Sequence, residues 1–372
     1  MNEMLEKLEA IATTVVAANA EKVDREGLYP QAAIDALRGA GLLGLISARS
    51  VGGLGGGHRE AVTVVERLAR ECGSTAMVVC MHYAGAAVVE KFGDEALRRQ
   101  VAQGEHLLTL AFSEAGSRSH FWAPVGTAKL EGESVRLDAR KSWVTSANHA
   151  TAYVWSSQPY GGEGASTIWF VPRNTKGLSP GGRFDGLGLR GNDSTPVLAE
   201  SVTVPLANRL GADGAGLSVM LECVLPIFNA MTASCAVGLM EGSTTAAAGH
   251  LSGTRYEHLS SSLSELPTVR AYLARMRIAT DAARCLLMDA VDAIERGRPD
   301  TMLRVLECKA AAGESATAVT DLAMRVCGGA AFRREVGVER RFRDARAGTV
   351  MAPTTDQLYD FIGKALCGLP VF

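Results

Sequence analysis

The spacing of apolar residues changes twice along the chain and predicts three successive blocks. In the first block, apolar residues recur at three- and four-residue steps from Leu5 to Val15, which is one face of a helix. Pro30 is suited to open another helix, and two more helices are expected over residues 58–72 and 74–92. The pattern predicts an N-terminal helical domain over residues 1–109.

Strand periodicity replaces helical periodicity near residue 110. Val135 and Leu137 alternate with polar neighbours, so the two sets are expected on opposite faces of a strand. Later apolar and β-branched runs stop at Pro172 and Pro205. This pattern predicts a small antiparallel β domain over residues 110–212.

Helical spacing returns in the last block. Between residues 269 and 297 apolar residues fall close to a seven-residue repeat, which is typical of a long helix in a bundle, and Gly297 with Pro299 would end it. A helical bundle is expected over residues 213–372. The fold class is therefore α+β multidomain, in the order helix, sheet, helix.

Composition narrows the function classes. Of 372 residues, 47% are hydrophobic and 21% charged, which is ordinary for a globular protein, and a net charge of −2 gives no reason to expect a nucleic acid partner. The eight cysteines form no C-x-x-C pair, so no metal site is expected. Neither a signal peptide nor a run of about 18 apolar residues is seen, so no membrane span and a cytoplasmic location are expected.

Four segments, in this order along the chain, resemble signatures of the acyl-CoA dehydrogenase flavoproteins. Residues 110–119 are similar to the family's T-E-P-G-A-G-S-D segment, and residues 141–146 to its K-x-W-I-T-N strand. Residues 188–205 resemble the end of its β domain, and residues 327–356 its C-terminal signature. The resemblance implies an N-terminal helical domain, a middle antiparallel β domain and a C-terminal four-helix bundle, with FAD as cofactor.

By this resemblance, one set of residues would hold the flavin ring. Phe112 and Ser113 would lie along its pyrimidine edge, with Ser119 in the same segment, while Trp143 would pack on the ring face and Thr145 would bond near N5. An aromatic slab and a donor near N5 suit a ring that becomes more negative on reduction. The alternative for Trp143 is a core residue of the β domain.

A second set is implied for the phosphates and the adenine. Arg255 would reach the pyrophosphate of FAD in the neighbouring subunit, Gly328 and Gly329 would let the backbone approach it, and Thr354 would contact the adenine half. A solvated helix-end charge is the alternative for Arg255, and a helix C-cap is the alternative for the glycines.

The catalytic base departs from the family pattern. The position where most members carry a glutamate is Ala352, and residues 224–240, where some members carry it instead, contain no acid. The nearest carboxylate, Glu222, falls on another face of a helix. His82 is a candidate substitute, since histidine accepts a proton near neutral pH, although a buried and satisfied helix histidine is the simpler interpretation.

Three functions remain open at this point. The first is an FAD-dependent dehydrogenase of a small acyl thioester, bound to CoA or to an acyl carrier protein as a hydroxyacyl or aminoacyl group. The second is a flavin-dependent monooxygenase of the same fold, and the third is a non-catalytic partner subunit of a hetero-oligomer. The resemblance also implies a homodimer or homotetramer, with an electron-acceptor flavoprotein or oxygen as the oxidant.

Overall fold

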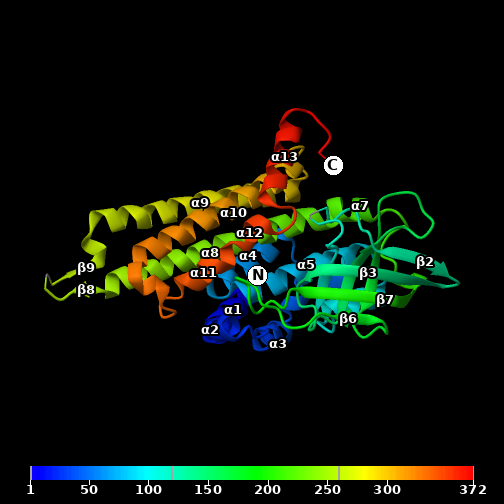
Figure 1. The fold of residues 1–372 in the computed structure, drawn as a ribbon, viewed down its shortest axis with the longest axis horizontal. Coiled ribbons are helices and arrows are strands. Elements are labelled where there is room, and N and C mark those ends of the chain that lie inside the picture. The colour runs from blue at the N-terminus through cyan, green and yellow to red at the C-terminus, as the bar shows by residue number, and fades with distance from the viewer. Residues whose placement is uncertain (1, 119, 259, 372) are drawn as a thin grey trace.

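A computed structural model describes residues 2–118, 120–258 and 260–371. The chain forms an elongated molecule in which long helices run along one axis and a β domain sits at one end of them (Figure 1). The three-block order read from the apolar spacing is therefore confirmed. The N-terminal helices pack beside the long C-terminal helices rather than forming a separate body.

Helices make up most of the first block. Its helices are α1 Asn2–Ile11, α2 Ala17–Glu26, α3 Gln31–Gly39, α4 His58–Glu71, α5 Gly73–Phe92 and α6 Glu95–Ala102, with a π-helical turn over Ala12–Val16. Pro30 is the N-cap of α3, as expected. An extended backbone at Cys72 separates α4 from α5, and α5 is buried on nearly every side.

The middle block contains two sheets. Its strands are β1 Leu108–Ala111, β2 Thr127–Glu131, β3 Ser134–Val144, β4 Ala152–Ser157, β5 Thr167–Pro172, β6 Leu178–Pro180 and β7 Thr195–Pro205. One sheet has the order β1-β4-β5 and the other β2-β3-β7-β6. Most pairs are antiparallel as predicted, but β1 runs parallel to β4, because the chain crosses the second sheet between them.

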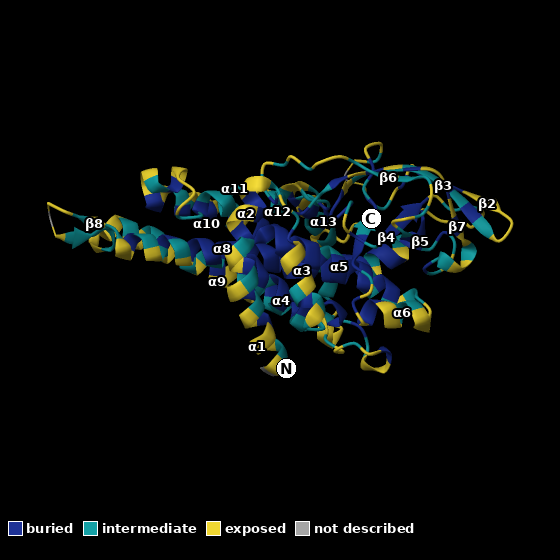
Figure 2. Ribbon diagram, turned by 90° about the horizontal axis from the view of Figure 1, so that it is seen from below, coloured by how far each residue is buried: buried dark blue, intermediate teal, exposed yellow. Residues whose placement is uncertain are grey.

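The three-stranded sheet separates two hydrophobic cores. Alternate residues of β4 point to opposite sides, with Val154 in the helical core and Tyr153 and Trp155 in the core of the β domain. All six residues of β4 are buried for this reason. In Figure 2 the buried residues accordingly continue from the helices into the sheet.

The third block is built on three long helices. After α7 Gly216–Ser218 and a π-helical turn over Val219–Val224, it contains α8 Leu225–Gly253, the short β8–β9 hairpin, α9 Pro267–Arg296, α10 Thr301–Cys327, α11 Val338–Ala345, α12 Ala347–Val350 and α13 Thr355–Leu366. Gly297, with φ 59°, ends α9 as predicted.

One helix in the described residues, Gly216–Gly253, is long and apolar enough by composition to cross a membrane. Its most apolar window is 89% buried inside the protein, the pattern of a core helix.

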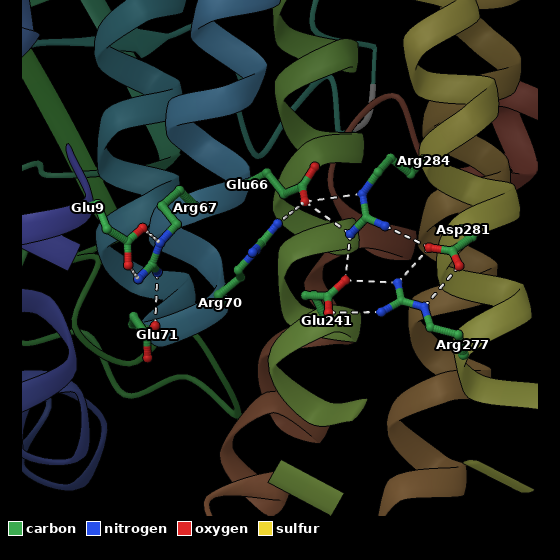
Figure 3. Close-up of polar contacts among 9 residues, drawn as sticks. All are labelled: Glu9, Glu66, Arg67, Arg70, Glu71, Glu241, Arg277, Asp281 and Arg284. Carbon is green, nitrogen blue, oxygen red and sulfur yellow. Dashed lines mark hydrogen bonds and ion pairs between the residues drawn. The ribbon is translucent and has the colours of Figure 1, made fainter. Parts of the chain in front are cut away.

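Ion pairs join the first and third blocks across α4, α8 and α9 (Figure 3). Arg284 on α9 contacts Glu66 on α4 at 3.0 Å and Glu241 on α8 at 2.7 Å. Arg277 also binds Glu241, and these hydrogen bonds, Arg277 first, lower the pKa of that carboxyl to about 2. The network fixes the relative position of helices that are more than 200 residues apart in sequence.

Candidate active site

A cavity of about 690 Å³ lies between the β domain and the helical bundle. Its β-domain wall comes from the segment after β1, the end of β3 and the loop before β7, and its helical wall comes from the start of α8 and residues 347–353. The predicted ring-binding residues Phe112, Ser113, Trp143 and Thr145 all line this cavity. Segments far apart in the sequence therefore meet at one place.

Trp143 projects into this cavity region rather than into a core. Its side chain is 71% exposed, whereas Trp155 and Trp169 are fully buried and form part of the β-domain core. The backbone of Trp143 is left-handed, with φ 57°, close to a register shift between β3 and β7. The core interpretation of Trp143 is therefore wrong, and a large indole face is available to a ligand.

A buried ion pair fixes the segment that follows β1 to strand β3. Lys141 Nζ contacts Glu114 Oε1 at 2.6 Å and also donates to the carbonyl oxygen of Ser156 at 2.7 Å. Glu114 Oε2 accepts hydrogen bonds from the backbone N–H groups of Val125 and Gly126. Burial lowers the pKa of Lys141 to about 8. The pair holds Phe112 and Ser113 opposite Trp143.

The wall at Ala352 carries no proton acceptor. Ala352 lines the cavity between Met351 and Pro353, whose carbonyl oxygens accept hydrogen bonds from the buried Lys309 Nζ at 3.0 and 2.6 Å. Among the lining residues that the structure describes, the only acid is Glu114, which is held in the ion pair with Lys141. Glu222 is exposed and bonds Ser218, away from the cavity.

The hypothesis that His82 is the missing base is wrong. Its Nε2 lies 2.8 Å from the carbonyl oxygen of Leu43, and its Nδ1 accepts a hydrogen bond from the N–H of Leu108 at 3.1 Å. The ring is fully buried and does not line the cavity. Burial lowers its pKa to about 4. His82 instead joins α5 to β1 and to the segment after α3.

The residues predicted to contact the phosphates and adenine do not line this cavity. Arg255 lies on the β8–β9 hairpin, at the end of the bundle farthest from the β domain (Figure 1). Gly328, with φ 55°, caps α10, and Gly329 follows it. Thr354 caps α13 by accepting the N–H of Gln357. Ser119 lies outside the described residues.

Comparisons with known proteins agree with this architecture. The models named "Acyl-CoA dehydrogenase, N-terminal domain", "middle domain" and "C-terminal domain" match residues 2–104, 109–202 and 214–367 in succession.

The chain belongs to the acyl-CoA dehydrogenase family. Human mitochondrial short-chain specific acyl-CoA dehydrogenase is 28% identical over 347 residues, covering 91% of this chain and 82% of that protein. Cyclohex-1-ene-1-carbonyl-CoA dehydrogenase of Geobacter metallireducens is 27% identical over 370 residues, covering 97% and 96%. The members of this family are oxidoreductases. The chain matches these two relatives over most of their length.

Solved acyl-CoA dehydrogenase-like structures share the fold. Butyryl-CoA dehydrogenase from Megasphaera elsdenii superposes with a TM-score of 0.92 at 22% identity, covering 98% of this chain and 97% of that one. A prolyl acyl carrier protein oxidase gives 0.89 at 19% identity, covering 98% of each chain. FMN-bound TdsC from Paenibacillus sp. A11-2 gives 0.89 at 22% identity, covering 99% and 98%.

The cavity residues fit the flavin that acyl-CoA dehydrogenases use. The exposed indole of Trp143 offers a flat face. Asn192 lines the same cavity, and its buried Oδ1 has no hydrogen-bond partner among the described residues. An unsatisfied buried acceptor is costly, so a ligand with donors at its edge would satisfy it.

Sequence reasoning missed three residues of this site. Asn192 lines the cavity, and Lys309 holds the wall at Ala352 through the carbonyl oxygens of Met351 and Pro353, which are more than 40 residues away and which no local pattern reveals. Arg118 also lines the cavity. Its signal was available, since an arginine stands in a segment of small residues that resembles a glycine-rich family motif.

Proposed function

We propose that the protein is an FAD-dependent dehydrogenase that oxidises a small acyl thioester at a carbon bearing a hydroxyl or amino group. The observation that carries this proposal is the cavity wall at Ala352, together with the absence of a free carboxylate among the described lining residues. A bound flavin supplies the hydride acceptor. This chain's residues then have to position the substrate carbon.

The missing carboxylate favours this substrate class for a chemical reason. Removing a proton from the carbon beside a thioester needs a positioned base, which typically contributes about 10²–10⁴-fold to the rate. A hydroxyl or amino group instead gives up its proton from oxygen or nitrogen, and that proton can pass to water. Transfer of a hydride to the bound flavin from the carbon that bears this oxygen or nitrogen then gives a carbonyl or an imine, and no protein carboxylate is needed.

The side chains around the cavity support a small acyl group. Phe121 and Phe228 line it, both are buried, and Met81 lies at the same wall. These side chains occupy volume that a long acyl chain would need. The fold shared with a prolyl acyl carrier protein oxidase supports a carrier-bound thioester as an alternative to CoA.

The distance between the two predicted residue sets supports an oligomer. Leu225 at the start of α8 lines the cavity, and Arg255 follows the end of this 29-residue helix, about 40 Å away at 1.5 Å per residue. If both sets bind FAD, the second set must act on the cofactor of another copy. We therefore propose a homodimer or homotetramer. The eight free cysteines fit a reducing, cytoplasmic location.

The test is anaerobic reduction of the protein-bound flavin. Hydroxyacyl, aminoacyl and plain acyl thioesters, each on CoA and on a carrier protein, are mixed with the purified protein, and visible flavin absorbance is followed. We expect bleaching with a hydroxyacyl or aminoacyl thioester and none with the plain acyl group. Failure of every thioester to reduce the flavin would end this proposal, whatever the oxygen-dependent behaviour.

A monooxygenase is the second candidate, because the same wall at Ala352 suits a reaction that requires no carbon-bound proton to be removed. It would consume oxygen and externally reduced flavin, and the electron acceptor would be oxygen rather than a flavoprotein. A non-catalytic partner subunit would show neither reaction alone. Oxygen uptake with reduced flavin therefore distinguishes the monooxygenase from the other two, and anaerobic flavin reduction distinguishes the dehydrogenase from the partner subunit.

A further inference from the structure

We propose that Arg118 forms a binding site for an oxyanion, a phosphate or carboxylate group, in the cavity beside Trp143. The inference rests on the proposed function, because the oxyanion would belong to a ligand of that cavity. It has two possible sources, the phosphates of the flavin nucleotide and an anionic group on the thioester substrate. Both present the same chemistry to a guanidinium.

The backbone at Arg118 is the first observation. Its φ is 50°, in the left-handed region that glycine adopts readily and other residues avoid. The nearby Gly116 does not have a positive φ, so the left-handed residue of this turn is the arginine and not the glycine. A hydrogen bond from Arg118 N–H to the carbonyl oxygen of Glu114, 2.9 Å long, closes the turn. Residues with a strained backbone of this kind cluster at ligand sites, where the position of the side chain serves binding.

The side chain is the second, independent observation. Arg118 lines the cavity and is exposed. Its guanidinium makes no hydrogen bond or ion pair with any residue that the structure describes. Elsewhere on the surface, arginines such as Arg59 and Arg343 are held by carboxylates at several points. The five N–H donors of Arg118 are therefore available to a ligand.

The charge balance of the cavity gives the sign of that ligand. Glu114 is the only acid among the described lining residues, and it is neutralised by Lys141 and by two backbone N–H groups. Arg118 is the only basic side chain among them. The cavity thus has one uncompensated positive charge. A guanidinium binds phosphate and carboxylate through two parallel hydrogen bonds, which a neutral ligand edge cannot match.

The test compares matched ligands that differ only in an oxyanion. One arm measures dissociation constants of FMN and riboflavin, which differ only in one phosphate group, for flavin-free protein by quenching of flavin fluorescence. The other arm uses flavin-loaded protein and compares acyl-phosphopantetheine with acyl-pantetheine, and an acyl group bearing a terminal carboxylate with its uncharged analogue. The variants are Arg118→Gln, Arg118→Lys and Arg118→Gly, with Arg140→Gln, an exposed arginine on β3, as control.

We expect Arg118→Gln to weaken binding of the oxyanion-bearing member of one pair by about 10- to 100-fold and to leave its neutral partner unchanged. The arm in which this occurs identifies the source. Arg118→Lys should retain part of the preference, and Arg140→Gln all of it. Arg118→Gly should lose the preference without lowering the melting temperature, because glycine suits the left-handed backbone.

The inference is overturned if no pair changes its preference in Arg118→Gln, or if charged and neutral members weaken equally, which would indicate a structural role. These binding measurements need no turnover. If Arg118→Gln loses the preference for the oxyanion but no thioester reduces the flavin of the wild type, only the proposed function is refuted. If a thioester reduces the flavin but Arg118→Gln keeps every binding preference, only the role of Arg118 is refuted.

Discussion

Replacing Lys141 with methionine should remove several kcal/mol of stability, because it leaves buried acceptors without their donor. The Lys141 and Glu114 side chains are only 0% and 4% exposed. The substitution orphans Glu114 Oε1 and the carbonyl oxygen of Ser156, which accept from Nζ at 2.6 and 2.7 Å. At about 1–3 kcal/mol for each, and more for a charged group, the loss agrees with the roughly 3–5 kcal/mol typical of a broken buried pair.

Urea unfolding followed by circular dichroism measures this loss. Lys129→Met, the same substitution at an exposed position of β2, is the matched control and should cost less than about 0.5 kcal/mol. Adding Glu114→Gln to Lys141→Met should recover part of the stability, since the buried charge is then absent. A loss below about 1 kcal/mol in the single variant, or no recovery in the double variant, would refute this reasoning.

Three further changes test other features. Lys309→Met should reduce the rise in stability with pH: burial lowers the pKa of Lys309 from 10.5 to about 7, so the unfolded state binds an extra proton between these values, while Lys141, whose pKa burial lowers to about 8, should keep part of the rise in the variant; urea midpoints of wild type and variant across this pH range measure the difference in slope. Gly328→Ala should cost about 1–2 kcal/mol because φ is 55°, whereas Gly329→Ala, with open space for a Cβ and no positive φ, should cost less in the same urea assay. Ala352→Glu should place a carboxylate at the cavity wall and allow anaerobic flavin bleaching by a plain acyl thioester, which the wild type should not show; the absence of bleaching in a flavin-loaded variant would contradict this.

The sequence predicted the large elements because their apolar spacing is strong. The helices over 58–72 and 74–92 and the long helix ending at Gly297 correspond to α4, α5 and α9 within about two residues. The parallel pairing of β1 with β4 was missed. Strand direction depends on the connection between strands, which here contains β2 and β3 of the other sheet, and period-two alternation is the same in both directions.

The site was predicted in part. The family resemblance predicted that Phe112, Ser113, Trp143 and Thr145 would lie around one ligand, and in the structure all four line one cavity. His82 failed because the partners of a buried histidine, here Leu43 and Leu108, come from segments that no local pattern links to α5.

The core shared by the outer two blocks has a consequence for how this chain is made. Residues of α4 and α5 lie in the same apolar cluster as those of α8 and α10. During synthesis, therefore, α4 and α5 leave the ribosome well before the helices that cover them exist. Over that interval an apolar surface is open to the cell, and about 130 further residues must be made before α8 begins to cover it. Heat-shock conditions or chaperone depletion should thus reduce the yield of newly made chains far more than they inactivate molecules already folded.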